Sequence, residues 1–260
     1  MSRVLEVHGE PGPPARRRPA AAAFAGWGEE DDAGLGARLG AVAERLLAGV
    51  GACDGKHLVV ACAGEGVLAR AAARTGATVT AVEASAERAR LGRELCERER
   101  LDVRWAVAPV TRLPVADGAA DAVVSLFGVF HEADARSAAA ELTRAAAPGG
   151  AIALTAWAGV MAVLLRMAGG PATSSPRWAR YETAYLHFFA LPEFDVRMEE
   201  AYWRFADLDE AVQTLSAPAA AIGAADRARE TLPALLAEHG RKDDGAFVLC
   251  VDYATVFARR

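Results

Sequence analysis

Short apolar runs alternate with amphipathic stretches along residues 34–157 of the chain. Residues 57–61 (HLVVA) form a continuous apolar run typical of a buried strand, whereas residues 67–74 have the spacing of a helix. The alternation predicts strands at 57–61, 77–84, 102–108, 120–127 and 151–157, and helices at 34–50, 67–74, 85–100 and 133–147. Because parallel strands need crossover connections, this order predicts a parallel, doubly wound α/β sheet with helices on both faces.

The pattern changes after Trp157, where the strict alternation ends. The elements predicted there are a loop at 169–176, an aromatic helix at 177–190, helices at 207–215 and 225–240, and strands at 196–206 and 245–260. Residues 1–26 are rich in Pro, Arg, Ala and Gly and lack the apolar core of a secretory signal, so they are predicted to be a disordered leader. One domain is predicted to span residues 27–260.

Composition narrows the classes of partner. The formal net charge of −5 and the pI of about 5.6 argue against nucleic acid, which needs a clustered positive field. The longest apolar stretch, residues 151–165, is short for a membrane span and is broken by Thr155 and Gly159. We therefore expect a cytoplasmic monomer or homodimer that binds a small molecule, with no nucleic acid and no membrane as partner.

The four cysteines are scattered, with no C-x-x-C pair and no histidine at metal-ligand spacing. This predicts a reducing compartment, no disulfide framework and no metal site. Cys62 is interpreted as a small buried apolar residue rather than a reactive thiol.

A glycine turn follows the first predicted strand. Gly64 and Gly66 allow the backbone to approach a ligand closely, where side chains would collide. Glu83 ends the next strand, where a carboxylate can accept hydrogen bonds from both hydroxyls of a ribose. The residues GEGVLA fit the G-x-G-x-x-A pattern of dinucleotide-binding folds, so a dinucleotide is one alternative for the cofactor.

The later residues favour another cofactor. The segment TRLPVADGAADAVVSLFGVFHEADARSAAAELTRAAAPGGAIALTAW resembles the second half of class I S-adenosylmethionine-dependent methyltransferases. The matching motifs are Leu113-Pro114, Asp117-Gly118, Ser125, His131 and Pro148-Gly149-Gly150. The resemblance covers residues 34–157 and is closest to the small-molecule branch that includes quinone-biosynthesis methyltransferases. It implies a Rossmann-like, seven-stranded, mostly parallel sheet.

The resemblance also implies a cofactor, S-adenosylmethionine or S-adenosylhomocysteine, and roles for individual residues. The turn would cradle the methionine part, Glu83 would hold the ribose, and the end of the fourth strand would lie beneath the sulfonium. The implied cofactor-binding residues are Ala61, Cys62, Ala63, Gly64, Gly66, Glu83, Ala84, Pro109, Val110, Ser125 and Leu126.

On the substrate side, the family builds its cover where residues 159–195 stand, so we interpret them as a helical substrate cap. His131 is the candidate general base, because that loop faces the cofactor in the family; the alternative is a histidine that only shapes the pocket. The candidate substrate residues are Trp27, Phe130, Trp157, Trp178, Tyr181, Tyr185 and His187. Aromatic residues at helical spacing also form cores, so this alternative stays open.

Three positions depart from the family pattern. Val60 stands where an acidic residue is usual, Cys62 where Gly is usual, and Pro109 where Asp often accepts a hydrogen bond from the adenine amino group. The function expected is methyl transfer to a small, largely apolar or aromatic molecule, in bacterial secondary metabolism. Two alternatives remain: a non-methylating enzyme on the same scaffold, catalysing cyclisation, decarboxylation or rearrangement, and a non-catalytic binding subunit.

Overall fold

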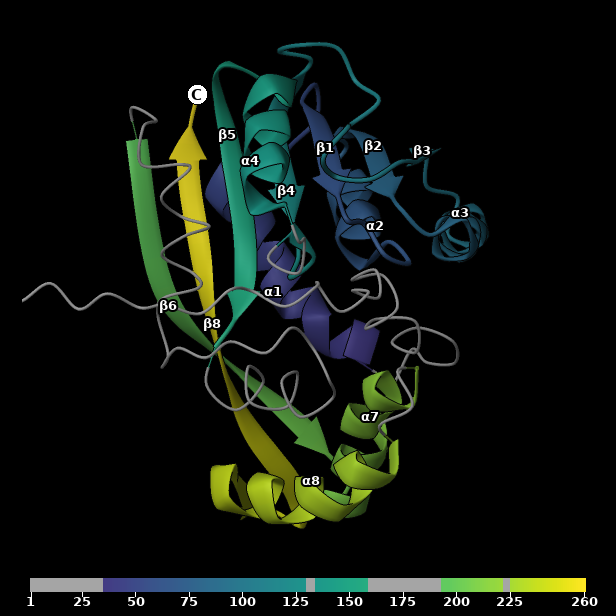
Figure 1. Cartoon of the computed structure of the whole chain (residues 1–260), viewed down its shortest axis with the longest axis vertical. Coiled ribbons are helices and arrows are strands. Elements are labelled where there is room, and N and C mark those ends of the chain that lie inside the picture. Colours follow the sequence, from purple (N-terminus) through teal and green to yellow (C-terminus); the bar gives the residue numbers. More distant parts are fainter. Residues whose placement is uncertain (1–34, 130–133, 159–192, 222–224) are drawn as a thin grey trace, which may run out of the picture.

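The structure, a computed structural model, describes residues 35–129, 134–158, 193–221 and 225–260 (Figure 1). Its elements in chain order are α1 (Leu35–Val50), β1 (His57–Ala61), α2 (Val67–Arg74), β2 (Thr78–Glu83), α3 (Ala86–Arg98), β3 (Val103–Val107), β4 (Ala120–Ser125), α4 (Ala135–Ala145), β5 (Ala146–Trp157), β6 (Glu193–Phe205), α7 (Leu208–Ala221), α8 (Ala225–His239), β7 (Gly240–Asp243) and β8 (Ala246–Arg259). The five strands and four helices predicted before residue 157 are all present. The start of β5 differs most, because it begins at Ala146 rather than at residue 151.

The strands form one sheet in the order β3-β2-β1-β4-β5-β8-β6, and β7 pairs with β8. The first five strands are parallel, whereas β8 runs antiparallel to both β5 and β6. The predicted Rossmann-like, mostly parallel sheet is confirmed, with β7 as an eighth strand that the sequence did not reveal. Its four residues, GRKD, are polar and mostly exposed, so no apolar alternation marks them as a strand.

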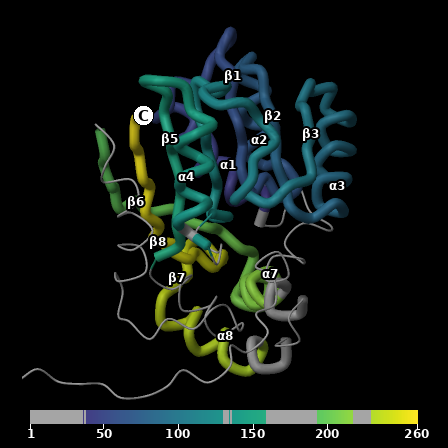
Figure 2. The backbone as a smooth tube through the Cα atoms, turned by 45° about the horizontal axis from the view of Figure 1, so that its top comes forward, coloured from purple at the N-terminus to yellow at the C-terminus, as the bar shows by residue number. Residues whose placement is uncertain are grey.

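Helices cover both faces of the parallel part (Figures 1 and 2). On one face, Leu46 of α1 and Leu68 of α2 pack with Val60 of β1. On the other face, Leu142 of α4 packs with Val59, the neighbouring residue of the same strand. Successive strand residues point to opposite faces, so a strand buried on both sides must be apolar throughout, as HLVVA is.

A second layer of packing lies beyond the carboxyl end of β5. Trp157, the last residue of β5, pairs with Tyr253, but β6 and β8 continue past this point as far as the pair Phe205 and Phe247. Helices α7 and α8 pack on this extension (Figure 1). Its core includes Trp203, Phe205, Leu215, Leu236, Leu249 and Val251. A described helical cover therefore stands on the side where ligands bind in open parallel sheets.

The predicted substrate cap at 159–195 lies outside the described residues up to residue 192, and its last three residues open β6. The cap stays a prediction. The leader at 1–26 also lies outside the described residues.

The Leu-Pro and Asp-Gly motifs before β4 have a structural role. The guanidinium of Arg144, in the last turn of α4, donates to the carbonyl oxygens of Leu113 (3.0 Å) and Val115 (2.8 Å). It also pairs with Asp117 at 2.7 Å and Glu141 at 2.6 Å. One planar side chain therefore holds the β3–β4 connection against α4.

We expect Arg144→Ala to lower the free energy of unfolding by about 2 kcal/mol, because two carbonyls and two carboxylates lose a shared charged donor. Arg144→Lys should restore little of the lost stability, since an ammonium group cannot reproduce the planar set of donors of a guanidinium. Urea denaturation is the measurement, and Arg136→Ala, an exposed position on the same helix, is the control. Equal stability of Arg144→Ala and the control would contradict the role of Arg144 as a clamp that holds the β3–β4 connection against α4.

Candidate functional site

The candidate site lies where the strand order reverses, between β1 and β4. The turn after β1 contains Gly64 with φ +58° and Gly66 with φ +90°, both in the left-handed region that glycine adopts freely. A Cβ on Gly66 would also lie 2.9 Å from the indole of Trp105. The turn therefore needs glycine for its backbone angles and for its packing.

Glu83 ties the ends of the first two strands together. Its carboxylate, with the residue only 5 % exposed, accepts a hydrogen bond from the Gly64 N–H at 2.8 Å and another from the Ser85 N–H at 3.0 Å. The Ser85 hydroxyl in turn accepts from the Arg88 N–H and caps α3. A carboxylate offers about four acceptor positions, so two remain for a ligand.

The other predicted cofactor residues gather at the same edge. Ala61, Ala63, Val110 and Ser125 are buried, Cys62 and Leu126 are half-buried, and Ala84 and Pro109 are exposed. The Ser125 hydroxyl is buried and has no hydrogen-bond partner among the described residues. A cradle of glycines, spare carboxylate acceptors and an unused hydroxyl at the end of β4 fit an adenosyl ligand with polar groups.

Backbone strain is concentrated in two non-glycine residues of this site. Cys62 has φ +52° and Phe127 has φ +59°, in a region that costs L-residues on the order of 1 kcal/mol each. Gly128 packs so closely that a Cβ there would lie 2.2 Å from the Cβ of Cys62. The family preference for glycine at position 62 thus has a physical reason in this chain.

The contact between positions 62 and 128 can be tested by a double-mutant cycle. Gly128→Ala should cost about 1–3 kcal/mol of unfolding free energy, because the new methyl group overlaps the Cys62 side chain. In a Cys62→Gly background the penalty should shrink by at least about 1 kcal/mol. Denaturant unfolding of the four proteins measures the coupling, and strictly additive effects would contradict the proposed contact.

An aromatic cluster lies directly beyond the end of β4. The rings of Phe127 and Trp157 are stacked, with centroids 3.4 Å apart and planes 4° apart. Trp203 meets Trp157 edge-on at 5.7 Å, and Tyr253 meets Phe127 edge-on at 5.9 Å. Trp157, predicted to contact the substrate, is thus a packed residue only 2 % exposed, and its contact with a substrate stays a prediction.

Tyr253 makes the stability of this cluster depend on pH. Burial, reinforced by the Glu199 carboxylate, raises the pKa of Tyr253 above its ordinary value near 10. The unfolded chain therefore loses this proton first, so stability is complete below a pH of about 10 and falls as the pH rises toward the folded-state pKa.

We expect Tyr253→Phe to show a shallower loss of unfolding free energy above a pH of about 10 than the parent chain. The loss that remains is assigned to other groups, including Tyr202, whose hydrogen bond to Glu200 raises its pKa to about 12. Urea denaturation across this pH range is the measurement. If the unfolding free energy of the variant fell with pH as steeply as that of the parent, Tyr253 would not titrate as described.

Seven predicted site residues cannot be placed: Trp27, Phe130, His131, Trp178, Tyr181, Tyr185 and His187 lie outside the described residues. Their roles stay predictions. Close to His131 in the sequence, the described residue Asp134 has a structural role: its carboxylate accepts from the Ser137 N–H at 3.0 Å and caps α4.

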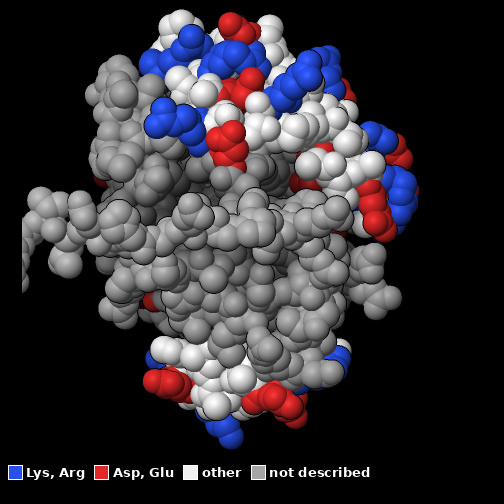
Figure 3. Space-filling view, in the orientation of Figure 1, with Lys and Arg blue, Asp and Glu red and all other residues white. Residues whose placement is uncertain are grey.

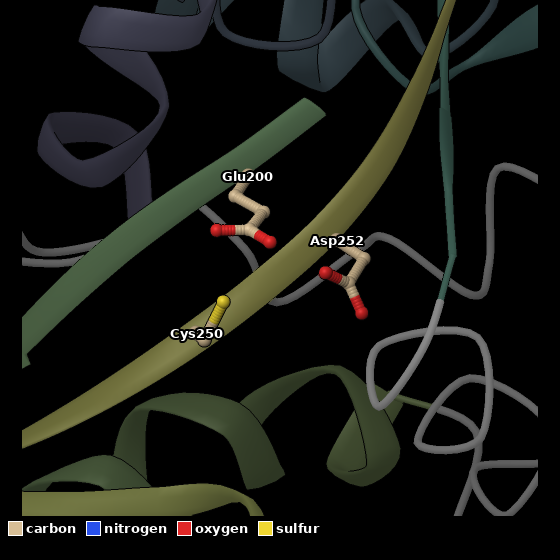
Figure 4. Close-up of side chains that lie close together, drawn as sticks. All are labelled: Glu200, Cys250 and Asp252. Carbon is tan, nitrogen blue, oxygen red and sulfur yellow. The ribbon is translucent and has the colours of Figure 1, made fainter. Parts of the chain in front are cut away.

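A group of possible metal ligands lies on the neighbouring strands β6 and β8 (Figure 4). The ligand atoms of Glu200, Cys250 and Asp252 all lie within 4.8 Å of one another. However, burial and the Glu200 carboxylate raise the pKa of the Cys250 thiol, and the Tyr202 hydroxyl donates to Glu200 at 2.6 Å. A protonated thiol and an engaged, exposed carboxylate are weak ligands, so we assign no metal to this group.

On the face shown in Figure 3, basic and acidic side chains are interspersed rather than gathered into one basic stripe. The expectation that nucleic acid is not a partner stays a prediction. None of the described helices combines the length and the apolar character that a membrane crossing requires.

Comparisons with known proteins agree with this geometry. Residues 58–154 match a family model described as a methyltransferase domain. Over 101 residues the chain is 33% identical to a demethylmenaquinone methyltransferase of Renibacterium salmoninarum, covering 39% of this chain and 41% of that protein. The chain thus spans about two fifths of the length of the curated relatives it matches first.

Two solved structures share the fold. The YcgJ protein of Bacillus subtilis has a TM-score of 0.61 at 13% identity, covering 86% of this chain and 98% of that chain. The [4+2]-cyclase SpnF has a TM-score of 0.56 at 16% identity, covering 93% and 91%. At such identities the likeness establishes the architecture alone.

Proposed function

We propose that the protein, whose residues 58–154 match the methyltransferase-domain model, is an S-adenosylmethionine-dependent methyltransferase of a small, largely apolar or aromatic molecule. The observation that carries the proposal is the buried Glu83 carboxylate, which joins the glycine turn to α3 and keeps acceptor positions spare. The similarity to a demethylmenaquinone methyltransferase supports the class of acceptor. A place in bacterial secondary metabolism is part of the proposal.

The chain would bind and orient the cofactor rather than carry out covalent chemistry. When bound, S-adenosylmethionine supplies a methyl group activated by its sulfonium. Glu83 would accept hydrogen bonds from the ribose, and the left-handed Gly64 and Gly66 would let the backbone approach the methionine part. Rate enhancement in such a site comes from alignment of the acceptor and exclusion of water. His131 stays the proposed general base.

The proposal includes a cytoplasmic location and a monomer or homodimer. The cysteines support the location, because Cys53, Cys62, Cys96 and Cys250 form no disulfide.

Calorimetric titration with S-adenosylmethionine and S-adenosylhomocysteine tests the cofactor, with a nicotinamide dinucleotide as competitor. We expect both adenosyl compounds to bind and the dinucleotide not to bind. Binding of neither adenosyl compound, or preference for the dinucleotide, would refute the proposal.

A second function is favoured by the departures from the family pattern. Val60 is fully buried where an acidic residue is usual, and Pro109 offers no side-chain acceptor to an adenine amino group. The [4+2]-cyclase SpnF has the same architecture over 93% of the chain, although this likeness assigns no activity to the protein. A non-methylating enzyme on the same scaffold would therefore bind S-adenosylmethionine but release no S-adenosylhomocysteine in the presence of its substrate.

A further inference from the structure

The side chain of Arg88 lies over the glycine turn. Arg88 belongs to the first turns of α3, and its side chain is only 19% exposed. A Cβ on Gly64 would lie 2.6 Å from Nη2 of Arg88 and 3.4 Å from its Cζ. The guanidinium is therefore packed against the α-carbon of Gly64, at the position where the proposed cofactor approaches the backbone.

This guanidinium has no hydrogen-bond acceptor in the described part of the chain. Its Nε is buried and makes no hydrogen bond; its one described partner is Oε1 of Glu65, in an ion pair at 4.0 Å that is too long for a hydrogen bond. By contrast, Arg90 on the same helix pairs with Glu94 at 2.6 Å. A buried N–H group without an acceptor is costly, so a ligand atom that accepts from the Nε of Arg88 would be bound favourably.

Arg88 and Glu83 meet at the same residue of the turn. Oε2 of Glu83 accepts from the Gly64 N–H at 2.8 Å, while the guanidinium packs against the α-carbon of Gly64. A carboxylate and a guanidinium thus both contact the same glycine. A hydroxyl group both donates and accepts, so one hydroxyl can donate to a carboxylate and accept from a guanidinium at the same time.

We propose that Arg88 is a cofactor-binding residue that shares a ribose hydroxyl of the adenosyl group with Glu83. The inference rests on the proposed function, because it takes the ligand to be S-adenosylmethionine or S-adenosylhomocysteine. It also accounts for Pro109: with no side-chain acceptor for the base, the chain places a second charged group at the sugar. Recognition of the cofactor then depends on the ribose more than on the adenine amino group.

The test compares S-adenosylhomocysteine with its 2′-deoxy and 3′-deoxy analogues, by calorimetry, on the full chain. Arg88→Met is expected to weaken S-adenosylhomocysteine binding about tenfold, the value of one charge-assisted hydrogen bond. The matched control, Arg90→Met, removes an exposed arginine of the same helix and should change affinity less than about twofold. For the analogue that lacks the shared hydroxyl, Arg88→Met should lower the affinity less than about threefold.

The outcomes separate the two proposals. If the parent chain binds no S-adenosylhomocysteine, the proposed function and this inference both fall. If the parent binds and Arg88→Met binds equally well, or weakens all three ligands equally, the role of Arg88 is refuted while the proposed function stands. Thermal unfolding reports whether each variant is folded. If Arg88→Met does not fold, Arg88→Lys is tested instead. Lysine keeps the charge but lacks the planar guanidinium, so this variant should weaken the binding of S-adenosylhomocysteine more than that of the analogue without the shared hydroxyl.

Discussion

Glu83→Ala is expected to weaken the binding of S-adenosylhomocysteine at least about tenfold, or about 1.4 kcal/mol. The same change should lower the free energy of unfolding by about 2–4 kcal/mol, because the buried N–H of Gly64 and the half-buried N–H of Ser85 lose their acceptor. Calorimetry measures the affinity and urea denaturation the stability. The two effects have one cause, since the carboxylate that would hold the ribose also holds the turn.

Glu83→Gln separates these two effects. Its amide oxygen can still accept from one of the two N–H groups, but its NH₂ group cannot accept from the other, so we expect about half of the stability loss. Glu97→Ala, an exposed position on α3, is the control for both measurements. A folded Glu83→Ala protein with the affinity of the parent would reject the ribose role of this carboxylate.

The alternating strands and helices before residue 157 could be predicted because the pattern that defines each of them lies within a few neighbouring residues. A parallel strand buried on both faces must be apolar throughout, and HLVVA meets that requirement without reference to distant residues. Ser85 caps α3 for an equally local reason, since a helix start needs an acceptor within three residues. β7 was missed because a polar, exposed edge strand has no pattern to show.

The candidate site could be predicted only in part. The two glycines and Glu83 follow from strand ends, which the apolar runs locate. Arg88 could not be singled out, because arginines are common in this sequence and its place over Gly64 depends on how α3 packs. The Leu-Pro and Asp-Gly motifs were found by resemblance, but their physical reason, the clamp by Arg144, depends on a contact with α4 about 30 residues further along.

The aromatic cluster shows the same limit. Phe127, Trp157, Trp203 and Tyr253 come from four different strand regions, and only the pairing of β5, β8 and β6 brings three of them together. The sequence places Trp157 at the end of a strand but does not distinguish a pocket wall from a core. The structure shows Trp157 packed between the rings of Phe127 and Trp203.

Trp157→Ala is therefore expected to lower the free energy of unfolding by about 3–5 kcal/mol, as for other fully buried aromatic residues. Its second effect should reach the site. Phe127, strained at φ +59° and held by a hydrogen bond from its N–H to the Thr155 hydroxyl at 2.9 Å, loses the ring that it stacks on. We expect S-adenosylhomocysteine affinity to fall in the fraction of protein that remains folded.

Two variants decide between loss of stacking and general damage to the core. Trp157→Phe keeps an aromatic ring against Phe127 and should recover more than half of the stability and most of the affinity. Tyr202→Ala removes an exposed aromatic residue from β6, next to Trp203, and should change neither quantity by more than about 0.5 kcal/mol. If Trp157→Ala proved as stable as Tyr202→Ala, the cluster would not be the packed support that the ring geometry indicates. If Trp157→Ala lost stability but kept full affinity when folded, the end of β4 would be positioned by its own backbone bonds, independently of the aromatic residues behind it.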